Sequence, residues 1–279
     1  MKAEEVKVCV IRIEGTNCED ECARAFSSVG ASAEKVHLKQ LLGQCPSAMR
    51  RDLNDYHILA FPGGFSAGDY VRAGAIFAAR MKSGLSKDLV KFIDSGKPVI
   101  GICNGFQILV ELGALPALDG EALTEQPEAA LYTNSSGRFE CLPTLLKHEN
   151  HGKCVFTSDV PKHEVVMFPC AHAEGKLMFP KESEDHILDK MEQNDQIVFK
   201  YVDEKGEYAG YPWCPNGSVR NIAGISNVHG NVFGLMPHPE RVFDRLTHPD
   251  WTSTGDNPVA SGDGRVVFES ALKNVLKKN

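Results

Sequence analysis

One cysteine stands in a sequence context that suits nucleophilic chemistry. Residues 101–105 read Gly-Ile-Cys-Asn-Gly, directly after an apolar run and at the start of a helical pattern over Asn104–Leu112. A strand-to-helix nucleophile elbow turns so tightly that the second residue on each side must be small, as Gly101 and Gly105 are. The helix N-terminus favours a thiolate over a thiol. Cys103 is therefore predicted to be a nucleophile rather than a small core residue.

A thiolate of this kind needs a proton carrier, and residues 236–240, Met-Pro-His-Pro-Glu, contain one. In an extended segment the side chains at positions i and i+2 point the same way, so His238 and Glu240 should share a face. The two prolines stiffen the backbone between them. The pattern predicts that Glu240 orients the imidazole while His238 faces the sulfur. Taken alone, the segment is equally compatible with a proline-rich turn that happens to contain a histidine.

A glycine pair provides the third part of the predicted site. Gly63 and Gly64, followed by Phe65, come one residue after the apolar run Tyr56–Phe61, with Pro62 between. Adjacent glycines at the carboxyl end of a sheet strand leave bare backbone N–H groups in the crevice where such sheets bind ligands. Together with the N–H of Asn104 they are predicted to form an oxyanion hole. A plain turn is the alternative.

The elements that must position these residues alternate along the first half of the chain. Apolar, β-branched runs predict strands, and helical patterns separate them. The expected strands are 6–13, 33–38, 56–61 and 98–102, and the expected helices are 19–29, 85–93 and 104–112. Strands and helices that alternate at this spacing predict a doubly wound, mostly parallel α/β sheet.

The composition and residue pattern change after about Gly113, where a Pro- and Glu-rich stretch, 115–129, begins. Strands are expected in succession at 138–148, 154–158 and 165–171, which indicates an antiparallel excursion inserted into or appended to the sheet. A helix near 183–193, strands near 197–202 and 232–236, and a last helix near 266–276 complete the chain. Its length suits a single domain over residues 1–279.

Composition excludes several classes of function. A net charge of −7 with no basic stripe argues against nucleic-acid binding, and no apolar run is long enough to span a membrane. Nine scattered cysteines, an odd number, favour reduced thiols in the cytosol. A cytoplasmic protein that contacts neither membrane nor nucleic acid is therefore expected. Neither phosphate-binding glycine motif is present, so the sequence offers no standard nucleotide site.

One alternative concerns metal. His148, His151 and Cys154 have ligand-like separations, with Cys170 and His172 following. No CxxC pair completes such a site, and ordinary surface and core positions explain these residues better. The prediction is therefore that the chain binds no metal, with this cluster kept as the open alternative.

At this point a resemblance is visible. The runs GICNGFQ (101–107), FPGGFSAGDYVRAGA (61–75) and GLMPHPER (234–241) resemble the class I glutamine amidotransferases. The runs EGTNCEDE, NSSGRFE, AHAEG, PNGS and IAGISN are similar to one subfamily, the glutaminase subunits of phosphoribosylformylglycinamidine synthases. The resemblance spans nearly the whole chain and implies a flavodoxin-like amidotransferase fold.

The resemblance also implies roles and partners. Cys103 would be the nucleophile, His238 the general acid and base, and Glu240 the residue that orients it. Backbone N–H groups of Gly64 and Asn104 would hold the oxyanion, while Gln107 and Phe65 would contact glutamine.

The partners would be a PurL-like synthetase subunit and a small PurS-like accessory subunit. The synthetase would use ATP and Mg²⁺ in de novo purine biosynthesis, whereas this chain would bind no cofactor. The alternatives are an amidotransferase subunit of another synthetase, or a catalytically silent regulatory module of the same fold.

Overall fold

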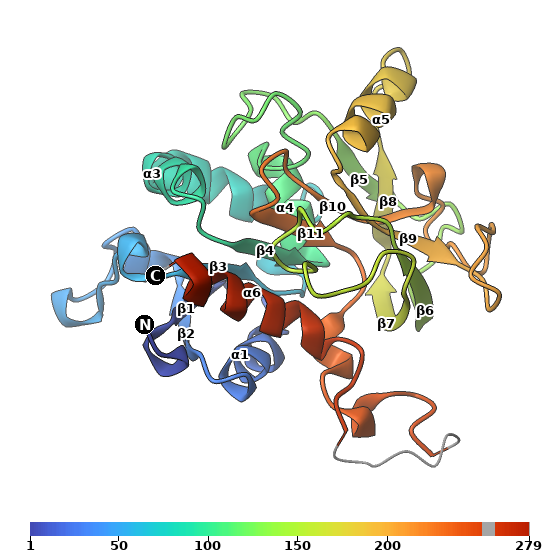
Figure 1. Ribbon diagram of the computed structural model, residues 1–279. Coiled ribbons are helices and arrows are strands. Elements are labelled where there is room, and N and C mark those ends of the chain that lie inside the picture. The colour runs from blue at the N-terminus through green and yellow to red at the C-terminus, as the bar shows by residue number, and fades with distance from the viewer. Residues whose placement is uncertain (253–259, 279) are drawn as a thin grey trace.

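The computed structural model describes residues 1–252 and 260–278, and its central feature is a nine-stranded sheet (Figure 1). The strands lie in the order β2-β1-β3-β4-β11-β10-β9-β6-β7, and a separate two-stranded sheet pairs β5 with β8. The large sheet divides into a parallel half and an antiparallel half. Four strands of the parallel half come from the first part of the chain, and β11, from its last part, pairs in parallel with β4.

The parallel half contains five strands: β1 (Lys7–Arg12), β2 (Ser32–His37), β3 (Ile58–Phe61), β4 (Val99–Ile102) and β11 (Val232–Leu235). All four pairings among them are parallel. β3, β4 and β11 are buried along their whole length, because helices cover both faces of a parallel sheet. The order 2-1-3-4-11 is the flavodoxin-like arrangement, so the predicted α/β fold class is confirmed.

Helices cover the two faces of this half (Figure 1). α1 (Glu19–Ser28) and α6 (Arg265–Lys278) pack together on one face. There the rings of Phe26 and Phe268 meet edge to face, with centroids 5.0 Å apart. α3 (Ala75–Asp94) and α4 (Asn104–Leu112) cover the other. Apolar side chains from both layers join the strands in one core. The described residues also include the short α2 (Leu38–Leu41) and α5 (Glu184–Gln193).

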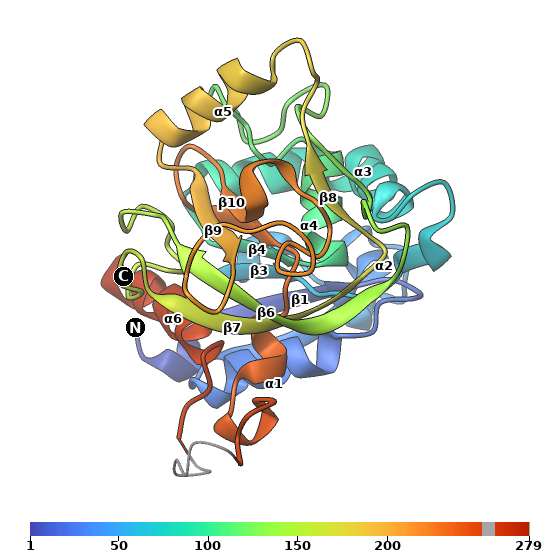
Figure 2. The same cartoon turned by 90° about the vertical axis from the view of Figure 1, so that its right-hand side faces the viewer.

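The antiparallel half extends the same sheet. It contains β10 (Ile222–Ser226), β9 (Ile197–Val202), β6 (Glu140–His148) and β7 (Val165–His172), and each pairing is antiparallel. Figure 2 shows β6 and β7 crossing the side of the molecule that faces the viewer. The separate pair joins β5 (Ala130–Thr133) to β8 (Glu174–Met178). The predicted antiparallel excursion is therefore confirmed as an extension of the main sheet.

Several element predictions were wrong. The strand expected at 154–158 is a series of turns, in which Thr157 N–H donates to the carbonyl of Cys154 at 3.1 Å. Its apolar residues are buried because Phe156 packs against Phe233, with ring centroids 5.9 Å apart. Strands β5, β8 and β10 were not predicted, and the helix expected at 85–93 begins ten residues earlier, at Ala75.

The described residues test some of the remaining expectations, which concern membrane spans, the cysteines and the number of domains. No helix among them is both long and apolar enough to cross a bilayer. The nine cysteines, all of them described, are free. That residues 1–279 form one domain stays a prediction. The stretch 242–264 includes residues 253–259, which lie outside the described residues, so the question of its role stays open there.

Candidate active site

Cys103 occupies a strained elbow between β4 and α4. Its φ and ψ are 53° and −107°, and it caps the N-terminus of the helix. A Cβ built on Gly101 would lie 2.4 Å from the carbonyl oxygen of Gly105, and one built on Gly105 would lie 1.9 Å from that of Phe61. The backbone therefore requires glycine at both positions, as predicted. A positive φ at a non-glycine residue costs energy and is often retained at functional sites.

His238 and Glu240 form a buried pair beside the elbow. His238 Nδ1 and Glu240 Oε1 are 2.6 Å apart, and both side chains are almost completely buried. Burial lowers the pKa of His238, but the charges of Glu240 and Cys103 outweigh burial and hold that pKa well above its usual value. His238 Nε2 is buried without a hydrogen-bond partner among the described residues. The imidazole is thus held by the carboxylate on one side and faces the sulfurs of Cys103 and Cys18 on the other.

The backbone around this pair differs from the predicted extended segment. β11 ends at Leu235, His238 is extended (φ −110°, ψ 92°), and Pro239–Val242 form a 3₁₀ turn. Proline at the first position of such a turn fits its fixed φ and its missing N–H. The two side chains therefore meet across the start of a turn.

The glycine pair lies against the same side chains. A Cβ on Gly63 would approach His238 Cε1 at 2.8 Å, Cys18 Sγ at 3.3 Å and Cys103 Cβ at 3.5 Å. Gly64 has a φ of +142° and packs against the backbone of residue 17. Among the described residues, the N–H groups of Gly64 and Asn104 donate no hydrogen bond. Asn104 directly follows the elbow cysteine, and Gly64 lines the same crevice as Cys103, so both unpaired donors belong to residues next to the sulfur.

The two predicted substrate contacts differ in their surroundings. Gln107 is buried, donates to the carbonyl of Glu174 and accepts from Asn104 Nδ2 at 3.0 Å, so its amide is fixed. Phe65 is 54% exposed at the rim. Both line a crevice of about 500 Å³ whose other lining residues include Cys103, His238, Asp69, Ala171, His172, Glu174 and Arg241. A larger cavity of about 590 Å³, near Arg138 and Tyr211, contains none of the predicted site residues.

Sequence reasoning assigned no role to several residues of this crevice. Cys18 Sγ lies within 4.8 Å of ligand atoms of His238 and Glu240 and accepts an N–H of Arg241 at 3.2 Å. Burial, together with the charge of Glu174, raises the pKa of Asp69 to about 6. The signals were present, because Cys18 and Glu174 lie in runs already noted for the resemblance.

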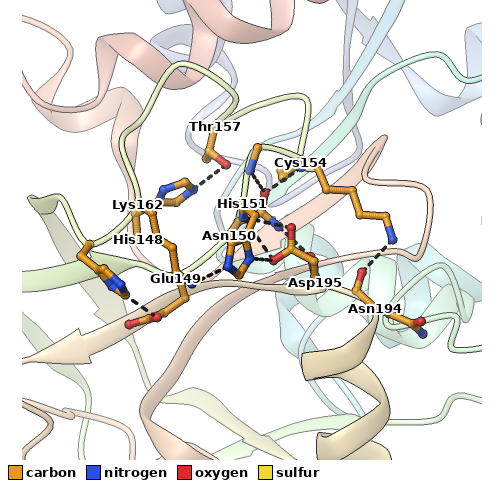
Figure 3. A network of polar contacts seen from close by, with 12 residues as sticks. His148, Glu149, Asn150, His151, Cys154, Thr157, Lys162, Asn194 and Asp195 are labelled. Atoms are coloured by element: carbon orange, nitrogen blue, oxygen red, sulfur yellow. Dashed lines mark hydrogen bonds and ion pairs between the residues drawn. The ribbon is translucent and has the colours of Figure 1, made fainter.

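The alternative metal cluster is engaged in other contacts (Figure 3). His148 is bonded at both ring nitrogens, to the carbonyl of Pro161 at 3.1 Å and to Thr157 Oγ1 at 3.0 Å. His151 pairs with Asp195 at 2.8 Å. Within the described residues, metal-ligand spacing is met by Cys18, His238 and Glu240 instead. Among the described residues, the structure does not bring His148, His151 and Cys154, the open alternative, together as ligands.

Comparisons with known proteins agree with this geometry. The family model "CobB/CobQ-like glutamine amidotransferase domain" matches residues 5–275. The chain belongs to this family. Curated relatives named phosphoribosylformylglycinamidine synthase subunit PurQ include one from Archaeoglobus fulgidus, 61% identical over 99% of this chain and 100% of the relative. Another, from Picrophilus torridus, is 43% identical over 94% of this chain and 96% of the relative.

A solved structure shows the same fold. It is described as the structure of PurLQS from Thermotoga maritima, with a TM-score of 0.71 and 32% identity. The match covers 97% of this chain and 99% of the other. The resemblance predicted from motifs is therefore confirmed over nearly the full length, and the chain is a glutamine amidotransferase.

Proposed function

We propose that this chain is the glutaminase subunit of a phosphoribosylformylglycinamidine synthase. It hydrolyses glutamine at Cys103 and delivers the ammonia to a separate synthetase chain. The observation that carries the proposal is the buried contact of 2.6 Å between His238 and Glu240 beside a strained cysteine elbow. The 61% identity to a PurQ subunit over the full length supports the choice of synthase.

The first chemical step is attack on the side-chain amide of glutamine. The sulfur of Cys103 forms a C–S bond to the amide carbon, and the oxyanion accepts hydrogen bonds from the N–H groups of Gly64 and Asn104. Each such donor typically contributes ~3 kcal/mol to transition-state stabilisation. His238, as the imidazolium that Glu240 favours, protonates the nitrogen as the C–N bond breaks. Ammonia leaves and a γ-glutamyl thioester remains.

The second step regenerates the enzyme. Neutral His238 takes a proton from water, and the resulting hydroxide attacks the thioester carbon. The C–S bond breaks, glutamate is released, and the thiolate–imidazolium pair of Cys103 and His238 is restored. General acid–base help of this kind is worth ~10²- to 10⁴-fold, so neither the oxyanion hole nor the histidine provides the whole rate.

The partner synthetase completes the reaction. It uses ATP and Mg²⁺ to convert formylglycinamide ribonucleotide to its amidine, whereas this chain binds no cofactor of its own. A synthetase subunit and a small accessory subunit are its proposed partners in the cytoplasm. The PurLQS description of the Thermotoga maritima structure supports this assembly.

Replacing the nucleophile tests the proposal. Cys103→Ala is expected to abolish amidine synthesis from glutamine, because no thioester forms, and to leave synthesis from added ammonium salts intact in the assembled synthase. Product formation with each nitrogen source provides the measurement. Glutamine hydrolysis near the wild-type rate in this variant would show that Cys103 is not the nucleophile.

A further inference from the structure

His172, at the end of β7, is a buried histidine that faces the crevice and has no part in the triad. Its side chain is 3% exposed, lines the crevice next to Ala171, and packs over Gly175, where a Cβ would lie 2.6 Å from the ring. Its Nε2 is buried and has no hydrogen-bond partner among the described residues. An unpartnered buried polar atom is costly, so a ligand that completes it is the natural explanation.

The neighbouring amide determines which ring nitrogen carries the proton. Asn134 Nδ2 donates to the carbonyls of His172 at 2.8 Å and of Arg138 at 2.9 Å. Asn134 Oδ1 accepts from the N–H of Gly175 at 3.0 Å, which fixes the amide orientation. The same oxygen lies 3.2 Å from His172 Nδ1, so Nδ1 donates the hydrogen bond. Nε2 of the neutral ring is then a hydrogen-bond acceptor.

The ring stays neutral in this environment. Burial, helped by the positive charge of His238, lowers the pKa of His172 to about 4. At neutral pH its Nε2 therefore keeps its lone pair. It accepts hydrogen bonds and does not transfer a proton.

A second acceptor lies beside it. The carbonyl oxygen of Ala171 is 3.7 Å from Cys103 Sγ, close to where the bond to the substrate carbon forms. Two unpaired donors of the same site, the N–H groups of Gly64 and Asn104, suit the carbonyl oxygen of a carboxamide. Acceptors suit its NH₂ group. The crevice thus has complementary groups for both ends of an amide.

We propose that His172 Nε2, with the carbonyl of Ala171, accepts the N–H groups of the glutamine carboxamide and of the ammonia formed from it. His172 is then the specificity-determining residue for an amide over an acid or ester, an inference that rests on the proposed function. A carboxylate has no N–H to donate, so its oxygen would face the lone pairs of His172 Nε2 and of the Ala171 carbonyl without a hydrogen bond. Sites that hydrogen-bond an N–H strongly reject substrates that lack it.

Two substitutions of His172 test the roles of its two ring nitrogens separately. His172→Asn keeps a donor near the Nδ1 position, for Asn134, but removes the acceptor at Nε2, whereas His172→Gln can place its amide oxygen there. Glutamate release would be measured with the chain assembled with its synthetase, from glutamine and from glutamate γ-methyl ester, whose leaving group has no N–H. We expect His172→Asn to lower kcat/KM for glutamine at least tenfold and for the ester less than twofold. His172→Gln should recover most of the loss.

His148→Asn is the matched control. His148 is equally buried, and both of its ring nitrogens are bonded within the polar network of Figure 3. His148 is not among the residues that line the crevice. This variant should leave the ratio of the two kcat/KM values unchanged. An equal fall for both substrates in His172→Asn would overturn the proposal. If His172→Asn does not fold, His172→Gln is compared with His172→Met, which has no comparable acceptor. The same ratio of kcat/KM for glutamine to kcat/KM for the ester in these two variants would overturn the proposal. A wild-type assembly inactive on glutamine would instead overturn the proposed function itself.

Discussion

The three residues of the proposed triad follow from residue type and spacing, because each depends on a local signal. Cys103 has glycines two residues away on both sides, and His238 and Glu240 are two residues apart in a proline-stiffened segment. The structure places all three together and buries them. Cys18 and His172 could not be assigned in this way, since they reach the crevice through contacts between distant parts of the chain.

The substitution Glu240→Gln tests the role of the His238–Glu240 pair. Glu240 raises the pKa of His238, and a neutral amide in its place removes that charge, so less imidazolium is available to protonate the leaving nitrogen. We expect kcat for glutamine hydrolysis to fall by ~10²- to 10⁴-fold with little change in KM. Steady-state kinetics measure this, with ammonium-dependent synthesis as the control. A kcat within a factor of two of the wild type would contradict the role of Glu240.

At the scale of elements, the strand-to-helix junction determines the reactive geometry. β4 ends one residue before Cys103 and α4 begins one residue after it, and both boundaries were predicted. Strands with clear apolar runs were predicted well. β8 and β10 were missed because each is five residues long and contains glycine, which weakens a strand pattern. The apolar stretch 154–158 shows the opposite error, since tertiary burial made a turn resemble a strand.

Gly105→Ala tests the junction. Alanine in a helix is otherwise favoured over glycine by ~1 kcal/mol. Here the new Cβ would lie 1.9 Å from the carbonyl oxygen of Phe61, a backbone atom of β3 that has little room to move. Overpacking costs ~1–3 kcal/mol or more, so we expect net destabilisation.

The urea midpoint of unfolding measures this effect. Gly210→Ala is the matched control, because a Cβ there meets nothing within 4 Å. It should change the midpoint little. A Gly105→Ala variant as stable as the wild type would show that the junction relaxes at low cost.

On the scale of the whole molecule, strand order assembles the site. β3, β4 and β11 are adjacent and parallel, with Phe61 paired to Gly101 and Gly101 to Gly234. The glycine pair, the cysteine elbow and the histidine segment therefore all leave the sheet at one edge, as expected of ligand sites in open α/β sheets. The sequence predicted each strand, but the adjacency of β11 to β4 depends on a connection of more than a hundred residues and was not predictable from local patterns.

The loop that follows the glycine pair combines backbone strain with exposed side chains. Ala67, Asp69 and Val71 all have positive φ, which is unfavourable for residues other than glycine. Tyr70 and Val71 are 75% and 87% exposed beside the crevice. An exposed, strained loop that directly follows Gly64, one of the proposed oxyanion donors, is well placed to move when the synthetase docks.

We therefore expect the free chain to be a weak glutaminase. Docking of the synthetase, with its ATP and nucleotide substrates, should raise kcat/KM for glutamine at least tenfold. Tenfold corresponds to about 1.4 kcal/mol of transition-state stabilisation, a modest demand on one repositioned N–H donor such as that of Gly64. Steady-state glutaminase assays of the isolated chain and of the assembly measure the change.

Tyr70→Ser should reduce this activation while leaving the activity of the free chain unchanged, because Tyr70 is exposed and does not line the crevice, so we expect its ring to contact the partner rather than the substrate. Tyr132→Ser is the matched control, since Tyr132 is similarly exposed, at 64%, but lies on β5. It should activate normally. Equal activity with and without the synthetase would contradict the coupling through this loop. The amidotransferase chemistry at Cys103 would still stand, because it depends on the buried triad and not on the exposed loop.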